Sequence, residues 1–264
     1  MQTATIPSSP NELRALIRNG KLVRATSGLA SGHVQANMVV LPKKQAFDFL
    51  LFCQRNPKPC PLIEVIETGS TEPRESAPGA DLRTDISKYR VYKNGELVDE
   101  PGEISNIWRE DMVSFLLGCS FTFESALITA GIPLPHFERG SNVSMFITSI
   151  PTKAAGTFSG PLVVSMRAIP QDKVVKAVQV TSRFPSVHGA PVHIGNPAAI
   201  GIEDVSAPDL GEPVEFQRDD VPVFWACGVT PQVVAMQSKP PLMITHSPGH
   251  MFITDLRNED LAVL

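Results

Sequence analysis

Proline interrupts this chain throughout and limits what it can fold into. There are 24 prolines in 264 residues, about 9 % against a typical ~5 %. A proline cannot continue the hydrogen bonding of a helix or a central strand, so this frequency favours many short elements joined by fixed turns over long helical bundles. Apolar residues make up 42 % of the chain, which is enough for a packed core.

Charge, hydropathy and cysteine content narrow the partners and the compartment. The formal net charge is −4, and no Lys/Arg-rich stripe favours nucleic acid or an anionic membrane. No apolar run approaches the ~20 residues of a membrane helix, and no signal peptide is recognisable. The four cysteines, Cys53, Cys60, Cys119 and Cys227, have no zinc-like spacing, so reduced thiols are expected. These features predict a soluble cytoplasmic protein.

Helix and strand patterns alternate along the chain, which predicts a mixed α/β (α+β) fold with sheets flanked by helices. The predicted helices cover 9–19, 43–54, 110–130, 173–180 and 231–237, the third with a break near Gly118. The predicted strands cover 38–41, 60–68, 143–150, 160–169, 223–227, 242–245 and 251–254. Apolar alternation on both sides of Asn94-Gly95 predicts a hairpin over 89–97.

Short similar segments raise the question of an internal duplication. TSGLASGH at 26–33 and TSRFPSVH at 181–188 share the pattern Thr-Ser-x3-Ser-x-His, and SMFITS at 144–149 resembles HMFITD at 250–255. FLLGC and FWACG lie between the members in the same order. Coincidence is an equal alternative, because true repeats normally show a regular period.

A duplication would give two subdomains. The first is expected at 1–155, with a hairpin insertion near 80–100, and the second at 156–264, carrying an Arg/His-rich loop. The boundary is uncertain, and the halves can interleave.

Two polar, glycine-containing loops are the candidates for a binding site. The loops at 26–33 and 181–196 combine hydroxyls, glycines and histidines, and we expect them to face one another across a small-molecule pocket. The candidate substrate-binding residues are Arg183, Ser27, Ser31, His33, Ser182, Ser186 and Gly189. Arg183 can hold a carboxylate with two hydrogen bonds, although a surface salt bridge is an equal alternative. The serines are turn formers by default.

The candidate catalytic residues are His188, His193 and His250. Histidine suits general acid and base roles near neutral pH, but many histidines are simply hydrogen-bonded loop or core residues. His246 and His250 are interrupted by Pro248, so they do not form the helical zinc pair, and no metal is expected. Cys119 and Cys227 are expected to be inert packing residues and Glu124 to lie on a solvated helix face. No GxSxG, Walker A or GxGxxG motif occurs.

Several longer segments resemble the D-glutamate cyclase family. They are TSGLASGHVQANMVVLP, GADLRTDISKYRVYKNGEL, FLLGCSFTFE, GPLVVSMRAIP, TSRFPSVHGAPVHIG, VPVFWACGVTPQ and HSPGHMFITD, which together span about residues 10–256. The resemblance implies a hydro-lyase of amino acid metabolism that converts D-glutamate to 5-oxo-D-proline with loss of water. Nothing in that reaction requires a redox cofactor, so no cofactor is expected.

That reaction makes definite demands on the site. The α-amine must lose a proton, the γ-carboxyl group must be neutralised, and the tetrahedral oxyanion must be stabilised. We assign Arg183 to the α-carboxylate and His188 to proton transfer, with His193 or His250 as its partner. Hydroxyls and N–H groups of 27–33 and 186–189 would bind the oxyanion. The alternatives are a non-catalytic binding protein for a small carboxylic acid and a metal-dependent lyase. A homodimer is compatible with the strand-rich pattern.

Overall fold

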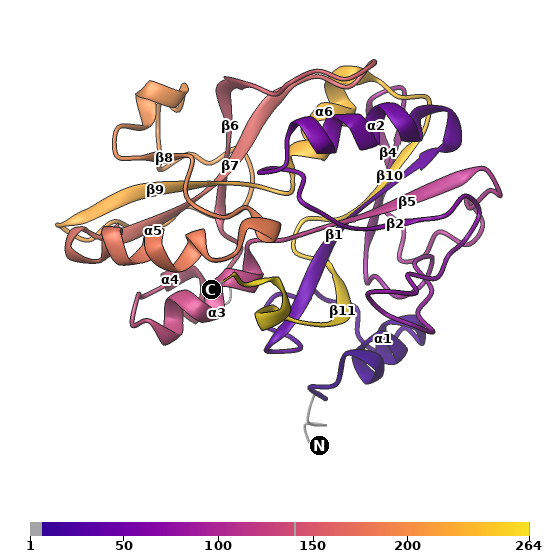
Figure 1. Cartoon of the computed structure of the whole chain (residues 1–264), viewed down its shortest axis with the longest axis horizontal. Coiled ribbons are helices and arrows are strands. Elements are labelled where there is room, and N and C mark those ends of the chain that lie inside the picture. Colours follow the sequence, from indigo (N-terminus) through magenta and orange to yellow (C-terminus); the bar gives the residue numbers. More distant parts are fainter. Residues whose placement is uncertain (1–6, 140, 264) are drawn as a thin grey trace.

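The computed structural model describes residues 7–139 and 141–263, which form two antiparallel sheets with helices packed on them (Figure 1). The predicted mixed α/β class is confirmed. The helices are α1 (Pro10–Arg18), α2 (Lys43–Arg55), α3 (Phe121–Thr129), α4 (Pro135–Arg139), α5 (Val174–Ser182) and α6 (Thr230–Ser238). Most are nine residues or shorter, as the proline content predicts.

The larger sheet has β1 at its centre. Its strands are β1 (His33–Pro42), β2 (Leu62–Ile66), β3 (Tyr89–Lys93), β4 (Glu96–Asp99), β5 (Met112–Leu117), β10 (Met243–His246) and β11 (Phe252–Arg257). They run in the order β2-β5-β1-β10-β3-β4, and β11 also pairs with β1. Strands from both proposed halves of the chain therefore share this sheet.

The smaller sheet has the order β6-β7-β9-β8. Its strands are β6 (Ser144–Pro151), β7 (Pro161–Pro170), β8 (His193–Ile194) and β9 (Asp220–Ala226). The long β7–β9 pairing runs from Val164 opposite Ala226 to Pro170 opposite Asp220. Phe123 and Leu127 of α3 and Ala177 of α5 pack against this sheet in one apolar core.

Successive side chains of β1 are buried on opposite faces of the larger sheet. Val39 and Leu41 pack with Phe49 and Phe52 of α2, while Met38 and Val40 join the core on the other face. This is the two-residue period of a strand covered on both sides. Because both faces are buried, β1 can carry polar side chains only where they find partners.

The predicted hairpin at 89–97 is confirmed as β3 and β4. Asn94 and Gly95 connect the strands with φ of +52° and +85°, as expected for the turn that matches strand twist. The helix predicted over 110–130 is wrong in its first part. Residues 112–117 form β5, which is buried throughout and pairs with β1 and β2. A short apolar run buried on all sides has no period that separates strand from helix.

The internal duplication is not confirmed. SMFITS lies in β6 and pairs with β7 in the smaller sheet, whereas the matching segment lies in β11 and pairs with β1 in the larger one. The two segments therefore occupy unlike positions in sheets of different size and order.

The two sheets meet where β5 and β9 end and helices α3 and α6 begin. Asn37 Nδ2 donates to the Gly118 carbonyl oxygen at 2.7 Å, and a Cβ on Gly228 would overlap the Asn37 side chain. Glycine is therefore required at 228 for close approach. The neighbouring thiols are protonated at neutral pH, because burial raises the pKa of Cys119 to about 12 and that of Cys227 to about 11. Among the described residues, no helix combines the length and hydrophobicity needed to cross a membrane.

Candidate active site

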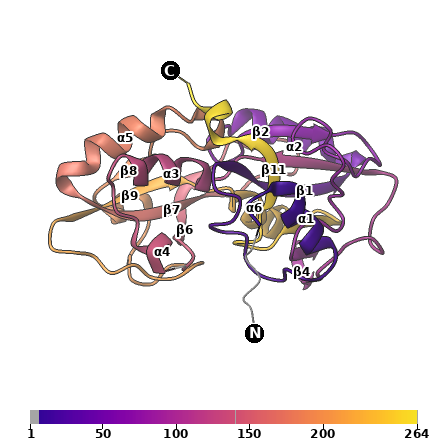
Figure 2. The same cartoon turned by 90° about the horizontal axis from the view of Figure 1, so that it is seen from below.

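A small cavity lies between the loop before β1 and helix α3. In Figures 1 and 2 this loop and the C-terminal segment both lie next to α3. We call this small cavity the inner cavity. It measures about 60 Å³ and is lined by 27–33, Gln35, Phe121, Glu124, Ser125, Phe137 and Asn258. It thus brings together elements from three distant parts of the chain.

The loop at 26–33 is built from two consecutive turns. The Leu29 N–H donates to the Thr26 carbonyl oxygen and the His33 N–H to that of Ala30, each at 2.9 Å. Their third positions, Gly28 and Gly32, have φ of +77° and +83°, a conformation that glycine adopts without strain. The repeated Ser-Gly of this loop therefore has a structural cause.

These turns leave the two loop serines available to a ligand. Ser27 and Ser31 occupy the second positions of the turns, and their hydroxyls make no hydrogen bond within the described part of the chain. Both residues line the inner cavity. Gln35 of β1 holds the first turn in place, because its Nε2 donates to the carbonyl oxygens of Thr26 and Leu29 at 2.9 Å each.

Three buried polar atoms around the inner cavity lack a protein partner among the described residues. They are His33 Nδ1, Gln35 Oε1 and Asn258 Oδ1. The amide of Gln35 is oriented by its two donated bonds, so its remaining atom is an acceptor. Buried polar atoms are nearly always paired, and an exception calls for an explanation. A polar ligand is one such explanation.

A carboxylate forms part of the same wall. Glu124 of α3 is 2 % exposed, and its Oε1 accepts from His136 Nε2 at 2.9 Å and from Arg167 Nε at 3.1 Å. Burial alone would raise the pKa of Glu124, but the Arg167 charge and the His136 hydrogen bond bring it below its usual value. The expectation of a solvated Glu124 is therefore wrong. Its Oε2 accepts no hydrogen bond from the described residues and remains available.

Arg167 is the counter-ion of Glu124 and is equally buried. Its Nη1 and Nη2 donate to Ser165 and Ser120 Oγ at 2.9 and 3.0 Å, and its guanidinium lies 5.3 Å from the ring centres of Phe123 and Trp225. The sequence does contain a signal for this pair. Arg167 interrupts the apolar run LVVSMRAI, and a charge in a buried strand requires a partner.

His188 lies outside the inner cavity. Its Nδ1 is 2.6 Å from the Lys58 carbonyl oxygen, so Nδ1–H donates and Nε2 is an acceptor. Nε2 is buried without a partner in the described part of the chain, and the residue has a left-handed φ of +84°. Burial lowers the pKa of His188 to about 4, so the ring is neutral at physiological pH. Its catalytic role stays a prediction.

The buried histidines should make stability depend on pH. Burial also lowers the pKa of His246 to about 4, while an unfolded histidine titrates near ~6.5. Below that pH the unfolded chain binds protons that the folded chain does not. The free energy of unfolding is therefore highest above about pH 6.5 and falls as the pH approaches the pKa of the folded state. At pH 5 each buried histidine has lowered it by about 2 kcal/mol.

Urea unfolding between pH 7.5 and 5 measures this dependence. The variant His188→Gln should lower the slope of unfolding free energy against pH by about one proton below pH 6. The control variant His193→Gln makes the same replacement at a half-buried position, and its slope is measured beside that of His188→Gln. Equal slopes in wild type and His188→Gln would show that His188 is not held neutral.

The other predicted site residues are spread over several surfaces. Ser182 is exposed and donates to the Val178 carbonyl oxygen at 2.6 Å, and Ser186 is exposed. Gly189 has φ of +64°, and its N–H donates to the Phe184 carbonyl oxygen. His193 is half-buried, with Nε2 2.7 Å from the Asn196 carbonyl oxygen. These residues do not line the inner cavity.

His250 and Arg183 have other surroundings. The Ser87 hydroxyl donates to the Arg24 carbonyl oxygen at 2.7 Å, so His250 Nδ1–H donates to Ser87 Oγ at 2.8 Å. Arg183 ends α5 and donates from Nε to the Val263 carbonyl oxygen at 3.2 Å. Of the predicted residues, Ser27, Ser31 and His33 therefore share the inner cavity, and α3 stands opposite them in place of the 181–196 loop.

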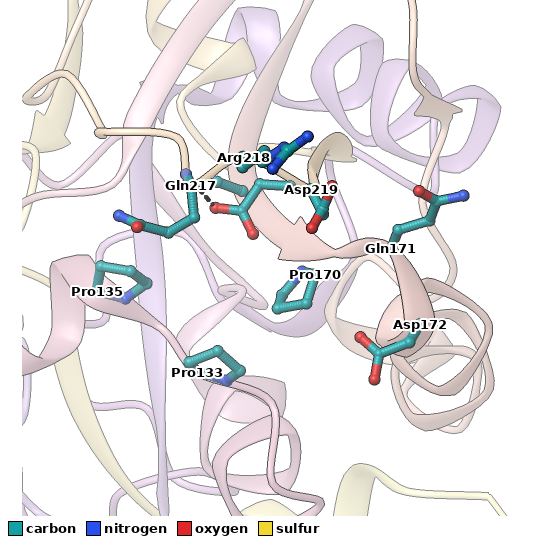
Figure 3. A pocket seen from close by; sticks show the side chains of 10 residues that line it. Pro133, Pro135, Pro170, Gln171, Asp172, Gln217, Arg218 and Asp219 are labelled. Carbon is teal, nitrogen blue, oxygen red and sulfur yellow. Dashed lines mark hydrogen bonds between the residues drawn. The ribbon is translucent and has the colours of Figure 1, made fainter.

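A larger hollow, where β7 ends and β9 begins, has a different character (Figure 3). It measures about 920 Å³ and is lined by prolines and exposed polar residues, including Asp172 and Arg218. Its polar groups face solvent, so they are not held for a ligand as the buried atoms of the inner cavity are. Within the described residues, no group of three or more His, Cys, Asp or Glu side chains is arranged to hold a metal ion.

Comparison with known proteins identifies the family. Residues 113–255 match the model of the family described as D-glutamate cyclase. A protein of Geobacillus kaustophilus is 62 % identical over 262 residues, covering 99 % of this chain and 100 % of that protein. One from Thermoanaerobacter pseudethanolicus is 64 % identical, covering 96 % of each chain, and one from Bacillus subtilis is 57 % identical, covering 97 % and 100 %. All three bear the name "Putative hydro-lyase". The chain belongs to the D-glutamate cyclase family.

Among solved structures, a nitrogen repressor-like protein from Methanococcus jannaschii matches with a TM-score of 0.40 and 13 % identity, over 90 % of this chain and 91 % of that one. A similarity this weak carries no argument about function.

Proposed function

We propose that this protein is a hydro-lyase that cyclises D-glutamate to 5-oxo-D-proline with loss of water. Family membership and the names of the relatives support the reaction class. The observation that carries the proposal is the inner cavity, where two amide oxygens, Gln35 Oε1 and Asn258 Oδ1, have no partner among the described residues and belong to the same lining as a carboxylate, Glu124. Acceptors and negative charge favour a ligand that supplies N–H donors.

An α-ammonium group is such a ligand. It has three N–H donors and a positive charge, and it would satisfy buried acceptors that otherwise cost free energy. Glu124 has one oxygen committed to Arg167 and His136 and the other available. The site thus combines a charged acceptor with neutral ones, which suits an amino acid better than a simple carboxylic acid.

His33 is the residue we assign to proton transfer. It lines the cavity, and its Nδ1 has no partner in the described part of the chain. The sequence favoured His188 for this role, but His188 is not among the lining residues. His33 would accept a proton from the ammonium group and make the nitrogen nucleophilic.

Ring closure then joins the nitrogen to the γ-carboxyl carbon. The hydroxyls of Ser27 and Ser31, which bond to none of the described residues, would donate to the oxyanion that forms. The C–O bond to the leaving oxygen breaks, and two of the protons that began on the ammonium group end on that oxygen as water. His33 carries them, so the step balances without an external reactant.

Incubating the purified protein with D-glutamate and separating the products by chiral chromatography tests the proposal. We expect 5-oxo-D-proline to accumulate in proportion to protein concentration. L-glutamate serves as the comparison for stereochemical preference. Thermal stabilisation by D-glutamate without any product would instead favour a binding protein for a small acid. The absence of both binding and turnover would rule out D-glutamate as the substrate.

A further inference from the structure

A second pocket adjoins the inner cavity and shares two residues with it. This outer pocket measures about 590 Å³ and lies between α3, α5 and the C-terminal 3-10 turn η4 (Asn258–Leu261). Ser125 and Asn258 line both spaces. The remaining wall is largely apolar, with Val180, Phe184 and Ala262, but it includes Arg183.

Ser125 and Asn258, the two residues that line both spaces, contact each other, and we call them the partition. Asn258 Nδ2 donates to Ser125 Oγ at 3.3 Å, which is a long and therefore weak hydrogen bond. Asn258 is also tied to the inner loop, since its N–H donates to the Gly32 carbonyl oxygen at 3.0 Å. The contact between the two side chains is thus weak, while the backbone that carries Asn258 is held.

The two spaces differ greatly in size. The inner cavity has a volume of about 60 Å³ and the outer pocket one of about 590 Å³. An amino acid with two carboxyl groups that binds in the inner cavity therefore has adjoining room for one of its ends in the outer pocket.

Arg183 is suited to bind the part of the ligand that lies in the outer pocket. The Val263 N–H donates to the Arg183 carbonyl oxygen at 2.7 Å and Arg183 Nε donates back to the Val263 carbonyl oxygen at 3.2 Å, which ties one edge of the guanidinium to the C-terminal backbone. The guanidinium NH₂ groups donate to none of the described residues. Glu259 shares the pocket and lies 3.7 Å from Arg257, its own counter-ion. Two free donors on one cation match a carboxylate.

We propose that the inner cavity and the outer pocket are two compartments of one binding site, joined when the Ser125–Asn258 contact parts. The α-carboxylate of the substrate binds Arg183 in the outer pocket, and its amine and γ-carboxyl group occupy the inner cavity. Asn258 acts as a positioning residue that turns its Oδ1 to the ammonium group. The inference rests on the proposed function and adds the route of entry and the carboxylate subsite.

The variant Arg183→Gln tests the subsite. We expect KM for D-glutamate to rise tenfold or more, with kcat changed less than threefold, because the lost contact binds substrate and transition state alike. Lys176→Gln is the matched control, since it removes an exposed positive charge from the same helix, and it should change neither constant. An unchanged KM in Arg183→Gln overturns the subsite.

The partition is tested by filling it. Ser125→Leu should block passage and abolish both D-glutamate turnover and its thermal stabilisation, and Ser125→Ala, which removes the hydroxyl without adding bulk, should impair both far less. Thr157→Leu is the control, because Thr157 is exposed and lines neither space. Full activity in Ser125→Leu overturns the two-compartment site.

If wild type neither binds nor converts D-glutamate, the proposed function fails. If wild type is active and the variants Arg183→Gln and Ser125→Leu behave like it, only this inference fails.

Discussion

Replacing His33 by alanine is expected to lower kcat for D-glutamate cyclisation by about 10²–10⁴-fold. The His33 ring lines the inner cavity with Nδ1 unpartnered among the described residues, and its loss leaves the ammonium group without a proton acceptor. The turn that carries it should persist, because its hydrogen bonds use the backbone of Ala30 and His33. Initial rates of 5-oxo-D-proline formation across substrate concentrations measure the effect.

Two matched variants make this result specific. His193→Ala removes a half-buried histidine outside the inner cavity and should leave kcat unchanged. His188→Ala creates a hole in a buried region and should lower thermal stability while retaining turnover at a temperature where it is folded. Loss of turnover in folded His188→Ala, with near-normal turnover in His33→Ala, would move the proton transfer to the 181–196 loop.

Replacing Arg167 by methionine is expected to destabilise the fold by about 3–5 kcal/mol, because it leaves Glu124 as a buried charge without its counter-ion. The side chains of the pair are 1 % and 3 % exposed. His136 keeps its hydrogen bond but cannot replace a permanent charge. Urea unfolding at pH 7.5 measures the loss. The defect should shrink at acidic pH, because protonation of Glu124 removes the unpaired charge.

The double variant Arg167→Met/Glu124→Leu separates charge from packing. Replacing both members of a buried ion pair by apolar residues is often neutral or stabilising, so most of the lost stability should return while activity does not. Arg109→Met is the control, since Arg109 pairs with Asp111 on the surface, with both side chains about half exposed; such pairs contribute ~1 kcal/mol or less. A double variant as unstable as the single one would show that packing dominates.

Elements with a strong local signal were predictable from the sequence. The helix after Pro42 begins at Lys43, and the Asn94-Gly95 hairpin forms as expected. The polar loop at 26–33 was also recognised, because repeated Ser-Gly pairs favour consecutive turns irrespective of what surrounds them. In each case the preference of a few neighbouring residues agrees with the final fold, so local physics was sufficient.

The composition of the candidate site was only partly predictable. Ser27, Ser31 and His33 were selected from residue type and clustering, and they line the inner cavity. Glu124, Gln35 and Asn258 were not, because nothing near them in sequence reveals their burial. Arg167 within its apolar run indicates a buried charge, but its partner Glu124 is 43 positions away, and the sequence does not show which carboxylate that partner is.

The sequence alone determined the family, the mixed α/β class and the turn-rich loop before β1. Only the tertiary structure decided that residues 112–117 are a strand, that α3 rather than the 181–196 loop closes the inner cavity, and which polar atoms remain unpaired there. The physical reason is that turn and helix preferences act between neighbours in the chain. Burial, ion pairing and the shape of a cavity depend on segments brought together from its two ends and its middle.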